Sequence, residues 1–528
     1  MLVEAVVAAF VATQLCYFVV NCGLLGLFLR RPTNVVDERT LGRVLERAAK
    51  QDERRPDDAA DRARARADGG HRGTSHSGTH AGTTTATSVD TSTTGVNTET
   101  TAADAEANPH RTPAVEDGPG PRCRLPERYR RRIHVFVPVA SDRWGALERT
   151  LASVARGTFP ASAITVYPVF ESPDSSSTDL EGTIDPRRPP GLEVDPIEVD
   201  PTKFGPTETD LGEADSEGAP YERPALAWTF EGPELSRSTA AAVADAYASR
   251  SVAADDVVTV LEAGTRVPVD ALELAVAGLE EYDIVQAKRT VDDVDGGILP
   301  LLESMGAAIR SDLEAGSSAG PFHLPGTAAF LEASALEDLD RWRRETESAL
   351  PLGVAASRRG YAFGVIDRYV RAPCPTRFGD WVREKRGWVR RLYRDLFARC
   401  VAGVDDRRRW AGTLLLQSLA VLTVVGLPAA ALVALLSPSG LDGVAFSTPM
   451  RFLVGFNAVV WIYAVVRAYR AAWDAVPFRS GLHKLAYSVL ANPGSQALYA
   501  MAWAVPIWLG LADVIRGRDE SAVDPASR

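Results

Sequence analysis

Residues 255–270 read D-D-V-V-T-V-L-E-A-G-T-R-V-P-V-D, and this stretch decides how the rest of the chain is interpreted. Residues 257–261 are a short, β-branched apolar run, which is typical of a strand buried on both faces. The run stops at Glu262, where Gly264 allows a turn and Pro268 can open the following helix. A carboxylate at the carboxyl end of a buried parallel strand lies at the sheet edge where open α/β sheets bind ligands. The alternative is that Glu262 is an acidic strand-end residue that only faces water.

Length and composition exclude several kinds of protein. The 528 residues are enough for two or three domains. A formal net charge of −11 argues against a general nucleic-acid binder. The five cysteines are scattered without a C-x-x-C pair, and no histidines show the H-E-x-x-H spacing. The sequence therefore supports neither a zinc site nor a disulfide framework.

Apolar segments lie near both ends of the chain. Residues 5–29 carry no charge and are long enough to cross a bilayer core, which needs ~20 residues. Three more apolar segments follow near the carboxyl terminus: residues 411–436, 452–466 and 497–515. The basic residues after residue 29, before residue 411 and after residue 466 belong on the cytoplasmic side by the positive-inside rule. These patterns predict a multi-pass protein of the cell membrane whose soluble part is cytoplasmic.

Residues 52–121 show neither a helical nor a strand period and are rich in Thr, Ser, Gly, Ala and charged residues. Such a tract cannot bury enough apolar surface to offset its ordering entropy, so we predict a disordered linker. The alternative, a modified or partner-binding tail, has no motif to support it.

Strands and helices alternate between the linker and the carboxyl-terminal apolar segments. A strand over residues 133–140, a helix beginning near Trp144 and a strand over residues 164–170 form a βαβ unit, which implies parallel pairing. Further strands are predicted over residues 192–199 (an edge strand in an irregular insertion), 257–261, 284–288, 326–331 and 361–366. Further helices are predicted over residues 238–249, 269–282, 298–313, 334–343 and 349–359.

Residues 380–400 have the pattern of an amphipathic helix. Trp381 and Trp388 fall near one face, and several arginines surround it. This arrangement suits a helix lying on an anionic membrane surface. The alternative is a solvated helix packed on its own domain.

These patterns divide the chain into five parts. They are an amino-terminal transmembrane helix (residues 1–30), a disordered Thr/Ser/Arg-rich linker (31–125), a cytoplasmic α/β domain (126–378), an amphipathic interfacial helix (379–405), and three transmembrane helices with a tail (406–528).

The order of features resembles the membrane-bound family 2 glycosyltransferases over roughly residues 133–391. Four regions carry the resemblance: V-F-V-P-V-A-S-D-R-W-G-A-L-E-R-T-L-A-S-V, Y-P-V-F-E-S-P-D-S, V-L-E-A-G-T-R-V, and E-T-E-S-A-L followed by R-R-G-Y-A-F-G-V-I-D and R-E-K-R-G-W. The resemblance implies a GT-A-like fold, an α/β domain with a mostly parallel sheet, attached to one amino-terminal and three carboxyl-terminal transmembrane helices.

The resemblance also implies an activity and a donor site. The protein would transfer a sugar from a nucleotide sugar to a lipid-linked or polysaccharide acceptor at the cytoplasmic face. Pro138 and Ser141 would shape the nucleotide loop, and Glu171 or Asp174 would meet the nucleoside. Glu262 would face the diphosphate and a divalent cation, Mg²⁺ or Mn²⁺.

The last two motifs imply which residues lie on the acceptor side of the site. Glu347, or else Glu345, would be the catalytic base. Lys385, Arg386 and Trp388 would line the acceptor or phosphate side. The implied partners are the sugar donor, the acceptor, the membrane, and an oligomer or a partner transferase, but no nucleic acid.

Three of these motifs depart from the family pattern. In D-x-D, Glu262 replaces the first Asp and Gly264 occupies the third position. The E-D motif reads Glu-Ser at residues 347–348, and a neutral Ser is a poor general base. In Q-x-x-R-W, Glu384 stands at Gln and Gly387 at Arg.

Two alternatives follow. The first is a catalytically inactive homologue that acts as a membrane scaffold or partner of an active transferase. The second is a transporter with a regulatory soluble part, which would need ionisable residues inside the spans, and Asp513 is the clear candidate.

Overall fold

The computed structural model describes residues 2–29, 34–51, 122–139, 143–171, 188–199, 237–316, 327–346, 352–401, 448–476, 481–490 and 492–516. The chain divides into two compact units, one of Met1–Leu45 with Pro121–Arg528 and one of Glu46–Gly120. The sheet, the candidate site and the carboxyl-terminal helices all belong to the first unit.

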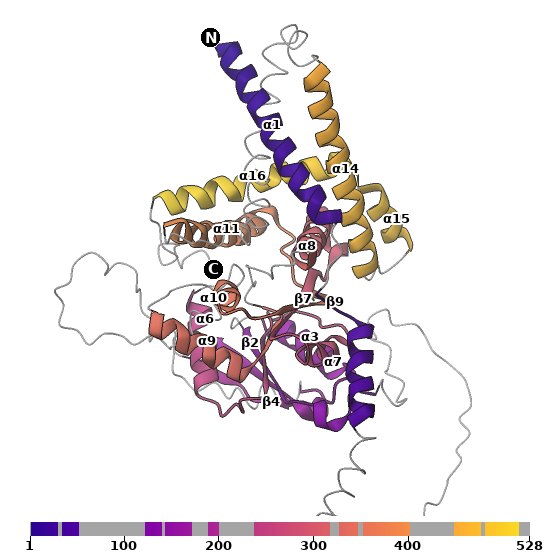
Figure 1. Ribbon diagram of the computed structural model, residues 1–528, viewed down its shortest axis with the longest axis vertical. Helices are drawn as coiled ribbons and strands as arrows, with labels where there is room; N and C mark the ends of the chain where they lie inside the picture. The colour runs from indigo at the N-terminus through magenta and orange to yellow at the C-terminus, as the bar shows by residue number, and fades with distance from the viewer. Residues whose placement is uncertain are drawn as a thin grey trace, which may run out of the picture. The chain divides into compact units, whose positions relative to one another are not determined.

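A nine-stranded sheet is the centre of the described α/β part, in the order β1-β9-β7-β8-β6-β2-β3-β4, with β5 also pairing with β3 (Figure 1). Its strands are β1 (Val35–Val36), β2 (Ile133–Val139), β3 (Ile164–Glu171), β4 (Glu193–Val194), β5 (Ile197–Val199), β6 (Val257–Val260), β7 (Ile284–Val291), β8 (Ala329–Glu332) and β9 (Phe363–Ala372). Strand β8 runs antiparallel to β6 and β7, and the other named pairings are parallel. The predicted mostly parallel sheet is confirmed.

Helices cover both faces of this sheet because successive side chains of a strand point to opposite faces. Val135 and Val137 of β2 pack in one apolar cluster with α3 (Trp144–Ala155) and α7 (Ala271–Gly278). Phe136, between them, packs in a second cluster with α6 (Arg237–Ala248), α9 (Ala333–Thr346) and α10 (Leu352–Arg358). The remaining named helices are α1 (Leu2–Leu29), α8 (Ile298–Gly316), α11 (Phe378–Val401), α14 (Thr448–Ala475), α15 (Gly481–Leu490) and α16 (Pro493–Ile515).

The predicted strands and helices of the α/β part are found, with shifted ends. The edge strand expected over residues 192–199 is split into β4 and β5. Strand β9 continues to Ala372, six residues beyond its predicted end. Strand β1 was not predicted, because two residues carry no period; Val35 and Val36 pair with Val365 and Ile366 of β9.

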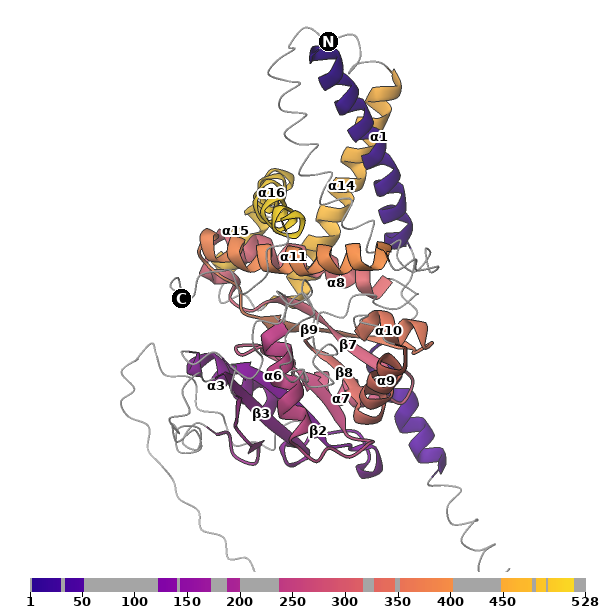
Figure 2. The same ribbon diagram turned by 90° about the vertical axis from the view of Figure 1, so that its left-hand side faces the viewer.

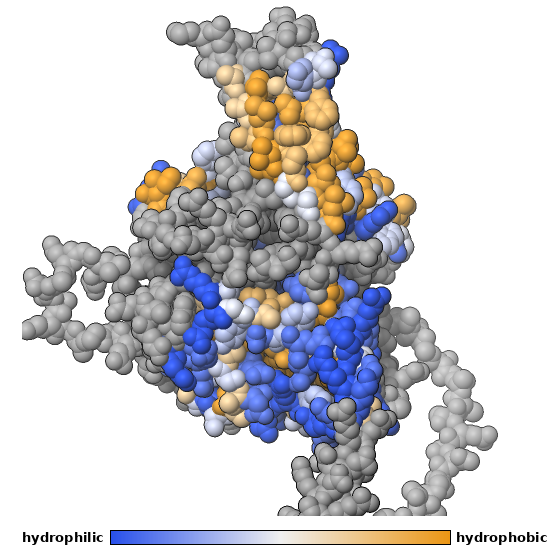
Figure 3. All heavy atoms as spheres, viewed as in Figure 1, coloured by the Kyte–Doolittle hydropathy of each residue, from blue (hydrophilic) through white to orange (hydrophobic). Residues whose placement is uncertain are grey.

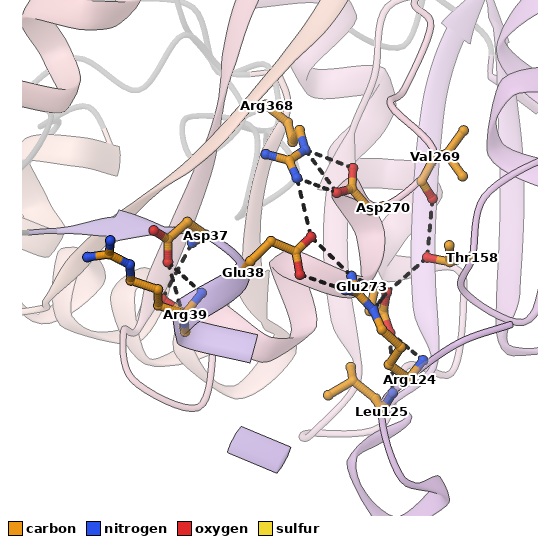
Figure 4. A network of polar contacts seen from close by, with 11 residues as sticks. Asp37, Glu38, Arg39, Arg124, Leu125, Thr158, Val269, Asp270, Glu273 and Arg368 are labelled. Atoms are coloured by element: carbon orange, nitrogen blue, oxygen red, sulfur yellow. Dashed lines mark hydrogen bonds and ion pairs between the residues drawn. The ribbon is translucent and has the colours of Figure 1, made fainter. Parts of the chain in front are cut away.

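A network of ion pairs fixes the segments that flank the linker to the α/β part (Figure 4). The carboxylate of Glu273, fully buried on α7, accepts hydrogen bonds from the backbone and guanidinium of Arg124. Arg124 also pairs with Glu38. Arg368 of β9 joins Glu38, at 3.3 Å, to Asp270, at 2.7 Å. The chain is therefore anchored beside α7 both shortly after β1 and shortly before β2.

Among the described residues, one helix is long and apolar enough to cross a membrane, over the 20 residues Thr448–Arg467 of α14. Helix α1 lies beside α14 (Figures 1 and 2). The rings of Phe18 and Phe456 are 4.9 Å apart, and the Asn21 side-chain amide donates to Asn457 at 2.9 Å. Apolar side chains dominate the surface of this helix pair (Figure 3).

The predicted count of four membrane spans is not established by the structure. Residues 411–436 lie outside the described part of the chain. The segment predicted at residues 452–466 belongs to the longer α14, and the one at residues 497–515 lies within α16. The described apolar stretches Phe10–Gly23 of α1 and Met501–Ile515 of α16 are shorter than a span requires.

Helix α11, which includes the predicted amphipathic residues 380–400, packs one of its faces against other helices, and its position at a membrane surface stays a prediction. Trp381 is fully buried and Val389 is 1% exposed. Figures 1 and 2 show α16 alongside α11, and the ring of Trp503 on α16 meets those of Trp381 and Trp388 edge-on, at 5.3 and 5.9 Å. The aromatic face of α11 therefore contacts α16.

Candidate functional site

Glu262 lies at the carboxyl end of β6, where the sequence predicted it. The preceding Leu261 still donates its backbone N–H to Phe136 of β2, so the chain leaves the sheet at Glu262 itself. The Glu262 side chain is 34% exposed, and its carboxylate pairs with the guanidinium of Arg289 at 2.9 Å. Glu262 is thus neither a sealed core residue nor a side chain that faces only water.

The backbone conformation at Gly264 explains why the third position of D-x-D is empty. Its φ of +97° is a left-handed conformation that side chains rarely adopt. A Cβ atom there would lie 3.4 Å from Pro373 and 3.5 Å from Ala146. The Gly264 N–H donates to the hydroxyl of Thr150 on α3 at 2.9 Å, which fixes the turn. A residue with a second carboxylate at this position would therefore strain the backbone, although its Cβ would make only ordinary van der Waals contacts.

Arg289 is the site residue that the sequence did not single out. It projects from β7 past the beginning of β8, where its guanidinium donates to the hydroxyl of Thr327 at 2.6 Å and reaches Glu262. The hydroxyl of Ser311 on α8 bonds both the backbone N–H and the carbonyl of Arg289, at 2.9 and 3.1 Å. Only 16% of the Arg289 side chain is exposed. Its placement depends on strand order, which no local pattern reveals.

Charges from two other elements act on Glu262. Burial raises the pKa of the Glu262 carboxyl, and the negative charge of Glu384 on α11 raises it further. Lys385 and Arg391 of α11, and Arg143 at the start of α3, lower it. The predicted nucleotide loop and the helix of the last motif therefore both bring charge to the end of β6.

Lys385 is held at this site by a buried carboxylate on α8. Its ammonium lies 3.1 Å from Glu303 and 2.8 Å from Glu384. Glu303 is 4% exposed and also accepts hydrogen bonds from the indole of Trp381, at 3.0 Å, and from the hydroxyl of Tyr499. One carboxylate thus joins α8, α11 and α16.

Arg386 and Trp388, the other two residues predicted on the acceptor side, contact α16. The guanidinium of Arg386 makes a bidentate pair with Asp513, at 2.6 and 2.7 Å. Asp513, the residue on which the transporter alternative depended, is thus paired within the protein, with 4% of its side chain exposed.

The remaining predicted residues are described in part or not at all. Pro138 lies near the carboxyl end of β2, opposite Val169 of β3. Glu171 ends β3 and Glu345 lies in the last turn of α9, each described by its backbone. Ser141, Asp174 and Glu347 lie outside the described residues.

The described residues do not fit the Mg²⁺ or Mn²⁺ site that the resemblance implied. They contain no group of three or more His, Cys, Asp or Glu side chains that could hold a metal ion. The carboxylate of Glu262 is bound to Arg289, and Gly264 has no side chain to offer. Mg²⁺ usually takes one or two protein carboxylates together with phosphate and water oxygens, and the one carboxylate of this motif is already paired with a guanidinium.

The mostly parallel sheet, its antiparallel β8 and the covering helices are those of a GT-A-like α/β protein. The family model described as "Glycosyl transferase family group 2" matches residues 257–511, a segment that begins at β6 and includes α11 and most of α16. This match confirms the predicted resemblance to the family 2 glycosyltransferases.

The chain is also similar to solved structures. One is the mannosyltransferase PcManGT from Pyrobaculum calidifontis in complex with GDP-Man and Mn²⁺, at 14% identity and a TM-score of 0.38, covering 76% of this chain and 90% of that one. Another is S. aureus TarS 1-349 in complex with UDP-GlcNAc, at 13% identity and a TM-score of 0.27, covering 74% and 93%. A comparison with curated proteins found no match.

Proposed function

We propose that this is a membrane-anchored glycosyltransferase-like protein that transfers a sugar from a nucleotide sugar to a lipid-linked or polysaccharide acceptor at the cytoplasmic face. The observation that carries the proposal is the convergence of Glu262, Arg289 and Lys385 at the carboxyl end of β6, inside the family-matched segment. Ligands of open α/β sheets bind at this edge.

The proposed roles follow the positions of the elements. Pro138 and Ser141, with Glu171 or Asp174, receive the nucleoside at the ends of β2 and β3. Lys385 lies on the diphosphate side, because its charge acts on Glu262. Glu347, or Glu345, takes the proton from the attacking acceptor hydroxyl; a positioned base contributes typically ~10²–10⁴-fold.

Membrane attachment is supported by the span-length stretch Thr448–Arg467 and by the apolar surface of α1 and α14 (Figure 3). We propose that the protein is multi-pass and that the α/β part is cytoplasmic, as the basic residues that flank the apolar segments favour. Because Arg386 and Trp388 contact α16, we propose that they set the position of α11 beside the acceptor.

The test is nucleotide binding by the full chain in detergent. UDP, GDP, CDP and ADP are compared for thermal stabilisation, since a ligand at 100 times its Kd adds about 2.7 kcal/mol to the stability of the native state. We expect one of them to raise the Tm, and Lys385→Met to weaken that response. Arg250→Gln is the matched control, because Arg250 pairs with Asp195 beside the edge strands β4 and β5. If no nucleotide stabilises the folded wild-type protein, the proposed function is wrong.

The inactive-homologue alternative is favoured by one observation, the left-handed glycine at residue 264, which leaves D-x-D without its second carboxylate. Hydrolysis of the matching sugar nucleotides separates the two functions. An active transferase releases the nucleotide slowly even without an acceptor, and Glu347→Gln lowers that rate. A scaffold binds the nucleotide without turnover.

A further inference from the structure

We propose that side-chain cations, with Arg289 at their centre, neutralise the donor diphosphate in place of a divalent metal ion. This inference rests on the proposed binding of a nucleotide sugar and adds the chemistry by which the diphosphate is held. Its first support is the position of Arg289, whose guanidinium lies against the Glu262 carboxylate at the end of β6, where the motif would place the metal.

The second support comes from Glu262 and Gly264, which occupy the two D-x-D positions that would hold a metal ion. The oxygen Oε2 of Glu262 is 2.9 Å from a guanidinium nitrogen of Arg289. A cation bound at that oxygen would lie against the positive charge of the guanidinium, which the Thr327 hydroxyl also binds. Gly264 has no side chain to contribute, and its φ of +97° disfavours any other residue at this position. The local structure therefore suits an arginine better than a metal ion.

The third support is the balance of charge around Glu262. Arg289 forms the direct pair, and Lys385, Arg143 and Arg391 act on the same carboxyl from α11 and from the start of α3. The negative groups that accompany them are Glu262, Glu384 and Glu303, which lies 3.1 Å from Lys385. Among these described groups the positive charges outnumber the negative ones, as a site for a polyanion requires.

Glu262 then acts as a positioning residue. An arginine presents its N–H groups in a rigid planar fork that matches phosphate oxygens, and it binds them best when its orientation is fixed. Glu262 on one side and Thr327 on the other provide that orientation.

The first experiment measures the affinity of the full chain for UDP, GDP, CDP and ADP by calorimetry, in EDTA and in Mn²⁺, and compares each with its monophosphate. We expect the preferred diphosphate to bind in EDTA. Arg289→Gln should weaken that binding about 10- to 100-fold, as expected for a lost charge-assisted hydrogen bond, and should change monophosphate binding less. Arg289→Lys should recover part of the loss, and Arg250→Gln should leave binding unchanged.

The second experiment asks whether Glu262→Gln weakens or strengthens binding of the diphosphate. If Glu262 were a metal ligand, replacing its charged carboxylate with a neutral amide should weaken metal-dependent binding. A residue that only orients Arg289 can be replaced, because the amide oxygen still accepts a hydrogen bond and a negative charge beside the diphosphate is removed. We therefore expect Glu262→Gln to bind the diphosphate in EDTA as tightly as the wild type, or several-fold more tightly.

The outcomes separate the two proposals. Binding that requires Mn²⁺, is lost in Glu262→Gln and is unaffected by Arg289→Gln overturns this inference but leaves the proposed function standing. Failure of all four nucleotides to bind, with or without Mn²⁺, overturns both. If Arg289→Gln does not fold, the results for Arg289→Lys and Glu262→Gln still decide the question.

Discussion

Truncation of Glu303 is expected to loosen α11 from the rest of the protein. Glu303→Ala removes one buried carboxylate that Lys385, Trp381 and Tyr499 share. Breaking a buried ion pair by removing one partner costs about 3–5 kcal/mol, and each buried donor left without an acceptor costs about 1–3 kcal/mol. These two costs do not add in full, because Lys385 remains paired with Glu384 at 2.8 Å. We therefore expect a loss of about 3–5 kcal/mol, which is on the order of 10 °C in Tm.

The assay is thermal unfolding of the detergent-purified protein, with Glu303→Gln as the matched control. The amide keeps an oxygen for Trp381 and Tyr499 but loses the charge that faces Lys385, so about 1–2 kcal/mol should be lost. In a double-mutant cycle, Glu303→Leu with Lys385→Met should cost less than the two single changes together, because no buried charge then lacks its partner. Equal Tm values for wild type and Glu303→Ala would refute the reasoning.

Three further predictions concern other parts of the protein. Gly264→Asp should lower the Tm by several degrees, because a left-handed non-glycine residue costs about 1–2 kcal/mol, and nucleotide affinity in Mn²⁺ should not rise above that of the wild type. Since the pKa of Glu262 is raised in the folded protein, folding favours its protonated form. Stability and diphosphate affinity should therefore both fall as the pH rises past the ordinary glutamate value of ~4.3. In pH titrations, Glu262→Gln should lessen both effects. Asn457→Leu removes the hydrogen bonds to Asn21 and Gln14, and thermal unfolding in detergent should show a loss of roughly 0.6–2 kcal/mol.

Much of the α/β part was predictable because its signals are local. The β-branched run before Glu262, the alternation of strands and helices, and the helix that contains Trp381 each depend on residues close together in sequence. Their order along the chain carries the resemblance to the family 2 glycosyltransferases. The sequence could not show which side chains from different strands contact one another. Arg289 meets Glu262 because β7 and β6 lie on either side of β8, and no periodicity encodes that order.

The same limit applies to α11. Its arginines and tryptophans favoured a helix on a membrane surface, but no local pattern showed that Trp381 would be fully buried or that Arg386 would pair with Asp513. The composition of a helix face limits which surfaces it can contact, whereas the tertiary structure determines which surface it does contact. The partners of α11 come from α8 and from α16, more than 70 and 100 residues away in sequence.

Two of the three departures from the family motifs meet at one place, which argues against independent decay. Glu262 and Gly264 belong to the first of these motifs, and Glu384, with its neighbour Lys385, belongs to the last; the charges of Glu384 and Lys385 act on Glu262. Loss of a metal site by decay would leave a carboxylate without a cation. Here the remaining carboxylate has a cation, the guanidinium of Arg289, which also bonds Thr327, while Ser311 bonds the Arg289 backbone. A guanidinium whose orientation is fixed at the ligand-binding edge of the sheet suits the binding of phosphate oxygens, which is the role that we propose for Arg289.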